Sequence, residues 1–281
     1  MRLRYLKRNR LAIVGAVGVG IFIVIAILAD FLQPYPEDSK GAIHIDTRLL
    51  PPSKVHYFGT TELGRDVFSL VIAGARLSLI IGILTISCAT SLGMMLGVAA
   101  AMIGGVVGEL IMRITDLFLC FPMLLLAMAI AALLGPGLTN AMIAVALSWW
   151  PSYVRLTYGE VITIKALPFV ESAKSIGVST FRLIFRHILP NILSVVLVNA
   201  SLDLGLVILT TSSLSFLGLG AQPPMPEWGL LISTGRVQFL TQWWIVTFPG
   251  LALFSVALSF SLLGDGLREA MDPRARVRGL T

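Results

Sequence analysis

The chain is predicted to be an all-α, polytopic membrane protein with six transmembrane helices, and three observations support this class. Of its 281 residues, 56% are hydrophobic and only 13% are charged. The mean hydropathy is +0.89, and a soluble domain could not keep that much apolar surface away from water. The apolar residues also form long uncharged runs that are separated by the charged residues, as in chains that cross a membrane repeatedly.

The first two runs are each long enough to cross the bilayer, which takes about 20 mostly apolar residues. Residues 11–29 carry no charge and exceed the roughly 7–15 apolar residues of a cleaved signal peptide. We therefore expect residues 11–31 to remain as the first span. Residues 77–103 are also uncharged and are predicted to be the second, leaving residues 32–76 as an outer loop.

The end of that outer loop is predicted to be a separate helix. Residues 59–76 are amphipathic and lack an uncharged stretch long enough to cross the membrane, so we expect them to lie along the outer interface. Arg65 and Asp66 stand near its start, where they are expected to form a structural pair rather than a ligand site.

The remaining spans follow from one long run and two shorter ones. Residues 117–154 are uncharged but too long for one span, and the sequence Gly135-Pro136-Gly137 is expected to break them into a tight helical hairpin. Residues 191–217 and 244–263 supply the fifth and sixth spans. Residues 77–267 then make up the membrane core, and residues 268–281 form a tail.

The distribution of Lys and Arg predicts the orientation of these spans. With the N-terminus inside, the terminal segments 1–10 and 268–281 and the loops 104–116 and 155–190 contain 15 of the 21 basic residues. Basic residues near span ends are retained on the cytoplasmic side. Both termini are therefore expected in the cytoplasm, and the protein in the cell membrane.

The cytoplasmic loop 155–190 contains signals for two short amphipathic helices. Pro168 suits the first turn of a helix, and Glu171 follows it, where the helix dipole favours an anion. Gly177 is expected to end that helix, and Ser179 or Thr180 to cap a second one that reaches residue 189. From these residues alone, the loop is equally compatible with a docking element and with a simple connector between two spans.

Four motifs resemble one transporter family and extend over nearly the whole chain. They are E-S-A-x-x-x-G at 171–177 with I-L-P at 188–190, F-G-T-T-E-L-G-R-D-V-F-S-L-V-I-A-G-A-R-L-S-L at 58–79, L-S-F-L-G-L-G-A-Q-P-P-M-P-E-W-G at 214–229, and L-L-G-D-G-L-R-E-A-M-D-P-R at 262–274. The first is similar to the EAA loop of inner-membrane permeases of binding-protein-dependent ABC importers. The others resemble the dipeptide, oligopeptide and nickel branch, in its subunit with the shorter outer loop.

This resemblance implies a type I importer permease fold in which residues 169–185 are a coupling helix that docks into a cytoplasmic ATPase subunit. The implied contact residues are small, charged or aromatic: Phe169, Glu171, Ser172, Ala173, Lys174, Gly177, Phe181 and Arg182. The implied partners are a homologous permease subunit, two ATPase subunits and an extracytoplasmic substrate-binding protein. ATP and Mg²⁺ belong to the ATPase subunits, because this sequence has no G-x-x-x-x-G-K-[ST] loop.

Asp203 is the one ionisable residue well inside a predicted span, and such a residue is a candidate for function. It is compatible with lining the transport pathway, with a polar contact between spans, or with proton coupling. The family often has a glutamate just before L-S-F-L-G, where this chain has Thr211 and Ser212. We therefore transfer no acidic site to that position.

The sequence gives little support for a metal site, an enzyme active site or nucleic-acid binding. His44 and His56 lie in the outer loop without a cysteine or third histidine nearby, so we expect no metal site. We also expect no cofactor, no catalytic residues and no nucleic-acid partner. The transported substrate is expected to be a di- or oligopeptide, with nickel, a nickel chelate or an oligosaccharide as alternatives. An ion-coupled secondary transporter is the alternative from another class, although it would need more intramembrane charges than Asp203 alone.

Overall fold

The computed structural model describes residues 10–271, except the side chains of Lys174, Ala270 and Met271. The predicted tail 268–281 and the first nine residues lie almost wholly outside this part. The described chain is helical, and its one β-type pairing is an isolated bridge between Thr60 and Asp66. The all-α prediction is confirmed.

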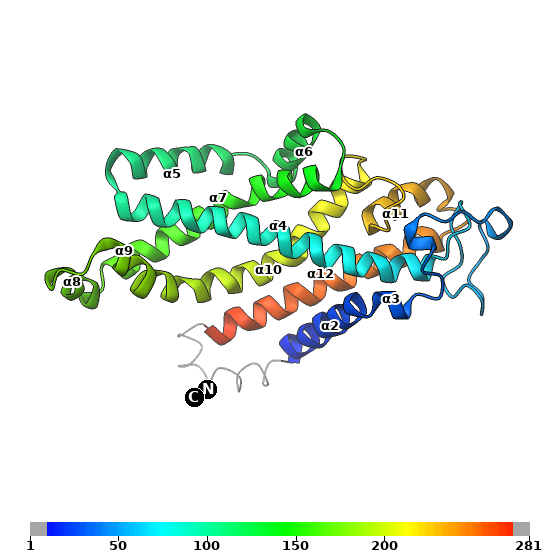
Figure 1. Ribbon diagram of the computed structural model, residues 1–281, viewed down its shortest axis with the longest axis horizontal. Helices are drawn as coiled ribbons and strands as arrows, with labels where there is room; N and C mark the ends of the chain where they lie inside the picture. The colour runs from blue at the N-terminus through cyan, green and yellow to red at the C-terminus, as the bar shows by residue number, and fades with distance from the viewer. Residues whose placement is uncertain (1–9, 272–281) are drawn as a thin grey trace.

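Five long helices run along the long axis of the molecule (Figure 1). They are α2 (Arg10–Ile27), α4 (Val67–Ile103), α7 (Leu138–Lys165), α10 (Leu189–Phe216) and α12 (Trp244–Met271). Shorter elements connect them: α3 (Ala29–Leu32), η1 (Asp38–Lys40), η2 (Ile45–Thr47), α5 (Gly105–Leu119), α6 (Met123–Leu134), α8 (Pro168–Ser175), α9 (Thr180–Leu183), a π-helical segment (Ile184–Ile188), α11 (Trp228–Gly235) and η4 (Arg236–Gln238). The outer loop and α11 lie at one end, and α8 and α9 at the other (Figure 1).

Small residues allow the central helices to approach closely. A Cβ atom on Gly93 of α4 would lie 2.4 Å from the Cβ of Tyr153, and one on Gly97 would lie 2.8 Å from the Cβ of Thr157. Inside a membrane the hydrophobic effect does not drive helices together, so close van der Waals packing at small residues is a main source of association. The glycines therefore allow α4 and α7 to pack closely at the centre of the molecule.

The predicted interfacial helix at residues 59–76 is wrong as a separate element. Asp66 caps α4, since its Oδ2 accepts a hydrogen bond of 2.8 Å from the backbone N–H of Ser69. From there the helix continues without a break to Ile103. Its 37 residues span about 55 Å at the usual helical rise of 1.5 Å per residue, so it extends beyond a hydrocarbon core of about 30 Å.

The region expected to contain the third span is a bent pair of helices. Gly104 and Gly105 have φ angles of +63° and +54°, which reverse the chain after α4. Residues 105–119, most of them expected in a loop, form α5, and a break before α6 at Pro122 turns the axis by 94°. The break at Gly135-Pro136-Gly137 was predicted and is confirmed, because α6 ends at Leu134 and α7 begins at Leu138.

The number of spans is not settled by helix length and composition. Four helices in the described chain are long and apolar enough to cross a membrane, and counting α5 with α6 as one span gives five. The helix α7 is not among them. The protein is a multi-pass membrane protein, and the count of six remains a prediction.

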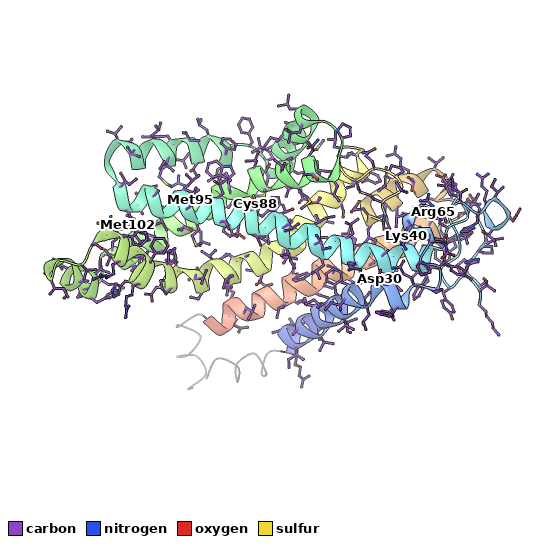
Figure 2. All side chains as sticks on the ribbon, in the orientation of Figure 1. Asp30, Lys40, Arg65, Cys88, Met95 and Met102 are labelled. Carbon is purple, nitrogen blue, oxygen red and sulfur yellow. The ribbon has the colours of Figure 1, made fainter. Side chains whose placement is uncertain are left out.

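Charged side chains of the described chain lie toward both ends of the bundle, and the outer-loop end holds one group of them. Figure 2 shows Asp30, Lys40 and Arg65 there, whereas Cys88 and Met95 lie along the middle of α4. Both cysteines of the chain, Cys88 and Cys120, are free and exposed on the surface of the bundle. The apolar middle and the charged ends match the pattern of a membrane-crossing protein.

Candidate functional site

The loop between α7 and α10 forms a short helical projection at one end of the bundle (Figure 1). The helix α8 begins at Pro168, as predicted, and ends at Ser175 before Gly177, which has a φ of +81°. Ser179 caps α9, its hydroxyl accepting a 3.4 Å hydrogen bond from the backbone N–H of Arg182. The prediction of two short helices that meet at Gly177 is confirmed in these respects.

Two boundaries of the loop differ from the prediction. Residues 155–165 continue α7 to Lys165 instead of beginning a loop. The second helix is also not separate from the fifth span, because α9, the π-helical segment and α10 join into one helix, Thr180–Phe216. A displacement of α9 would therefore act directly on α10.

The buried face of the projection is anchored on the ends of α4 and α7. Val170 and Leu183 are 0% and 1% exposed, and they belong to one apolar cluster with Val98 and Val161. Lys165 adds a polar contact, since its Nζ donates a 2.6 Å hydrogen bond to the carbonyl oxygen of Ala101. Burial of this kind fixes the position of α8 and α9 relative to the bundle.

Other parts of the projection present large apolar side chains that are partly or mostly exposed in the described chain. We call this set the apolar ridge: Phe169, Ile176, Phe181 and Phe185. Ile176 is 81% exposed and Phe181 is 69% exposed, and the rings of Phe181 and Phe185 lie 4.4 Å apart. Exposed apolar patches of this kind mark interaction surfaces.

The predicted contact residues separate into two groups. Phe169, Glu171, Ser172, Gly177, Phe181 and Arg182 are exposed. Ala173 is buried against the helices of its own chain, and so it supports the projection rather than contributing surface. The side chain of Lys174 lies outside the described part of the structure.

Ile176 and Phe185 are not among the contact residues that the sequence predicts, although they belong to the apolar ridge. Both lie within the implied coupling segment 169–185. Their exposure depends on how α8 and α9 pack against α4 and α7. No sequence motif predicts this packing.

A second candidate site lies between α7 and α10. The hydroxyl of Tyr153 donates a hydrogen bond of 2.6 Å to Oδ2 of Asp203. Tyr153 is 1% exposed, Asp203 is half-buried, and Trp149, one turn before Tyr153, also faces the carboxylate. Of the three roles considered for Asp203, the geometry directly accounts for a polar contact between helices.

The signal for this pair is weak in the sequence because the two residues are 50 positions apart. Tyr153 is one polar group in a run of apolar and aromatic residues, and nothing in its spacing links it to Asp203. Its position follows from Gly93 of α4, which leaves room for its backbone and Cβ.

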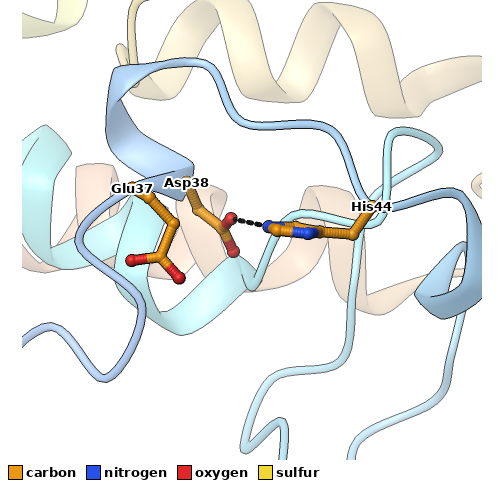
Figure 3. A group of neighbouring side chains, drawn as sticks. All are labelled: Glu37, Asp38 and His44. Carbon is orange, nitrogen blue, oxygen red and sulfur yellow. Dashed lines mark hydrogen bonds and ion pairs between the residues drawn. The ribbon is translucent and has the colours of Figure 1, made fainter.

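The outer loop contains a third group, in which the ligand atoms of Glu37, Asp38 and His44 lie within 4.8 Å of one another. Figure 3 shows Asp38 facing the ring of His44. Its Oδ1 lies 2.8 Å from Nε2 of His44, and its Oδ2 accepts a 2.7 Å hydrogen bond from the backbone N–H of Asp66. Both carboxylate oxygens thus have protein partners, and the group holds the loop against the start of α4.

The same region corrects the predicted pairing of Arg65 with Asp66. The Arg65 guanidinium instead donates to the carbonyl oxygens of Ala42 and Gly41, at 2.7 and 3.1 Å. Asp66 pairs with His56, whose Nδ1 lies 3.0 Å from its Oδ1. These residues have structural roles, as expected, but with different partners.

Comparison with known proteins identifies two family profiles in the chain. Residues 89–277 match the profile described as the binding-protein-dependent transport system inner membrane component. Residues 1–52 match the N-terminal transmembrane domain of oligopeptide transport permease C. The first match includes the projection with its apolar ridge and both residues of the Tyr153–Asp203 pair.

Individual relatives extend over almost the whole chain. A dipeptide transport system permease protein of Alkalihalophilus pseudofirmus is 44% identical over 97% of this chain and 89% of its own length. A probable D,D-dipeptide transport system permease protein of Escherichia coli K12 is 42% identical over 96% and 90%. A glutathione transport system permease protein of Pectobacterium atrosepticum is 40% identical over 97% and 90%.

A solved structure shares the fold at low sequence identity. The inward-facing MetNI methionine ABC transporter contains a chain that aligns with a TM-score of 0.54 and 16% identity, over 73% of this chain and 98% of that chain. This likeness supports the helical arrangement of the core and no more than that.

Proposed function

This chain belongs to the family of inner-membrane components of binding-protein-dependent transport systems, and from that premise we propose that it is a permease subunit that imports di- or oligopeptides. Three relatives carry names of dipeptide or glutathione transport permeases and match it over nearly their full length. Peptides are therefore the proposed substrate class, with nickel, a nickel chelate or an oligosaccharide as the alternatives to be tested.

The main observation in support of this mechanism is the apolar ridge, which lies on helices α8 and α9 that are anchored by their buried residues. Phe169, Ile176, Phe181 and Phe185 are exposed while Val170 and Leu183 are buried beneath them. Aromatic side chains supply much of the energy at protein interfaces when a partner covers them. We propose that a cytoplasmic ATPase subunit covers the ridge, with Glu171, Ser172, Lys174, Gly177 and Arg182 at its margin.

The transmission of movement follows from the continuity of the helix from Thr180 to Phe216. A shift of the docked ridge is passed along this helix to Asp203 and to the packing of α10 on its neighbours. The proposed cycle alternates outward and inward exposure of a pathway between this chain and a homologous permease. ATP is hydrolysed on two separate subunits, and an extracytoplasmic binding protein delivers the peptide.

Asp203 is the proposed polar group of the pathway. It is half-buried, and an ionisable group inside a membrane protein commonly faces the bundle interior or a water-filled cavity. The bond from Tyr153 orients one carboxylate oxygen, and the exposed part of the half-buried carboxylate can contact polar groups of a passing peptide.

Reconstitution tests the proposal. The complete transporter in liposomes, supplied with its binding protein and a labelled dipeptide, is expected to accumulate peptide only when ATP is present. Uptake that follows an imposed ion gradient without the ATPase subunits would instead establish a secondary transporter. A binding protein that retains nickel or a sugar and no peptide would overturn the substrate class while leaving the permease role intact.

A further inference from the structure

An apolar groove with a volume of about 610 Å³ lies between α2, α4 and α12. We call it the outer groove. Its walls include Ile21, Phe22, Ile72, Phe248, Leu251 and Val256. The volume is within the range of about 300–1,000 Å³ that ligand sites occupy.

The polar groups in its wall are already satisfied. The hydroxyls of Ser255 and Ser259 donate to the carbonyl oxygens of Leu251 and Ser255, at 2.6 and 2.7 Å. The groove therefore offers a ligand almost only hydrocarbon, and it suits an apolar chain rather than a peptide or nucleotide.

The position of the outer groove predicts that hydrocarbon surrounds it. All three helices that form it are long and apolar enough to cross a membrane. Ile21 and Leu251 in its wall are 55% and 54% exposed, so the groove is open along one side. Water has no polar partners there, whereas an acyl chain gains contact with both walls.

An exposed ion pair is formed by two residues that are close in sequence to the groove wall. Nη1 of Arg76 lies 2.6 Å from Oδ2 of Asp30. Ala75 and Leu32 line the groove. Arg76 directly follows Ala75 in the sequence, and Asp30 stands two residues before Leu32. The two side chains are 51% and 70% exposed, and they therefore present a cation and an anion together beside the apolar opening.

This arrangement is complementary to a zwitterionic headgroup. A phosphate can accept charge-assisted hydrogen bonds from the Arg76 guanidinium, and a primary ammonium can donate to the Asp30 carboxylate. A phosphatidylglycerol headgroup has the phosphate but no cation to offset Asp30. A phosphatidylcholine headgroup has a cation but no N–H to donate.

We propose that the outer groove binds one acyl chain of phosphatidylethanolamine, with the headgroup on Arg76 and Asp30. The lipid fills the space between α2 and the α4–α12 pair and so stabilises the position of α2. This site is separate from the apolar ridge and from Asp203, and it does not depend on which substrate is transported.

Retention of lipid by the complete transporter tests the proposal. The complex is reconstituted in vesicles containing equal amounts of phosphatidylethanolamine and phosphatidylglycerol, extracted again in dodecyl maltoside and washed, and its retained lipid is measured by mass spectrometry. We expect phosphatidylethanolamine to be enriched over the vesicle composition. Ser255→Phe fills the groove from an exposed position and should abolish the enrichment.

Matched variants separate this effect from general damage. Leu258→Phe places the same ring on an exposed position of α12 outside the groove, and it should leave the enrichment unchanged. Asp30→Asn should abolish the preference for phosphatidylethanolamine, because it removes the carboxylate that accepts from the ammonium. Arg113→Gln, which breaks another exposed ion pair, should preserve it.

Three results would overturn the proposal. One is equal retention of both lipids by the unaltered complex, and another is undiminished enrichment in Ser255→Phe. The third concerns a protein occupant: with Cys88→Ser and Cys120→Ser in place, efficient crosslinking of Ser255→Cys to the second permease would show that a neighbouring helix fills the groove.

Discussion

At Gly177 the backbone has a φ of +81°, and a Cβ added there would meet no atom within 4 Å. Space is therefore not what requires glycine within this chain. Glycine is required by the left-handed backbone conformation, which costs a residue with a side chain roughly 1–2 kcal/mol. Asparagine adopts this conformation more easily than a β-branched residue does. The turn between α8 and α9 depends on this one residue.

We predict that Gly177→Val lowers ATP-driven uptake and substrate-stimulated ATPase activity, whereas Gly177→Asn retains most of both. The valine disfavours the turn that places Phe181 beside α8, and its side chain also occupies the proposed interface. Uptake and ATPase rates of the reconstituted complex provide the measurement. Normal stimulated turnover in Gly177→Val, with normal amounts of protein in the membrane, would refute the role of this turn in coupling.

The Tyr153–Asp203 hydrogen bond should contribute measurably to the packing of α7 on α10. Tyr153→Phe leaves the ring in place and removes the donor, and the expected loss is about 1 kcal/mol of stability. Asp203→Leu keeps roughly the size of the side chain and removes the acceptor for the tyrosine. A double-mutant cycle on thermal unfolding of the detergent-solubilised complex would detect the coupling, and additive effects would mean that the bond contributes nothing.

At the scale of elements, α8 and α9 have one face buried on the bundle and one exposed face that we propose for docking. Leu183 is 1% exposed and Phe181 is 69% exposed, although they are two residues apart in the same short helix. A single element can thus be altered on either face alone. This allows stability and partner binding to be measured separately.

We predict opposite outcomes for alanine at these two positions. Leu183→Ala leaves a cavity beneath the projection and should destabilise the protein by about 2–5 kcal/mol. Phe181→Ala should change stability little while weakening association with the ATPase subunit. Thermal unfolding and co-purification of the ATPase are the two readouts, and equal loss of stability in both variants would contradict the division into two faces.

At the scale of the whole molecule, the apolar ridge and the outer loop lie at opposite ends of the helix bundle (Figure 1). Since α4 extends about 55 Å at the normal helical rise, the two ends are separated by more than a bilayer core. The excess of Lys and Arg on the side of the ridge predicts that this side faces the cytoplasm.

Cysteine labelling in intact cells tests this orientation. Both native cysteines are exposed, so Cys88→Ser and Cys120→Ser form the background. Lys54→Cys in the outer loop should react with a membrane-impermeant maleimide, and Thr163→Cys, at an exposed position near the end of α7, should react only after the cells are opened. The reverse pattern would place the termini outside and would be incompatible with a cytoplasmic ATPase on the ridge.

Several features could be predicted from residues alone because their causes are local. Pro168 and Gly177 define α8 through their own backbone preferences, and Gly135-Pro136-Gly137 separates α6 from α7 for the same reason. The long apolar runs identify a membrane protein because the bilayer imposes a minimum helix length. The four motifs identify the family, and the family in turn implies the expected coupling role of the projection.

Other features depend on contacts between distant segments and were decided only by the tertiary structure. The length of α4, the continuity of α9 with α10 and the bend between α5 and α6 differ from expectation because helix ends depend on packing partners as well as on composition. Tyr153 meets Asp203 because Gly93 admits it against α4. The resemblance selected the coupling segment 169–185, but which of its side chains are buried and which form the apolar ridge depended on how α8 and α9 pack on α4 and α7.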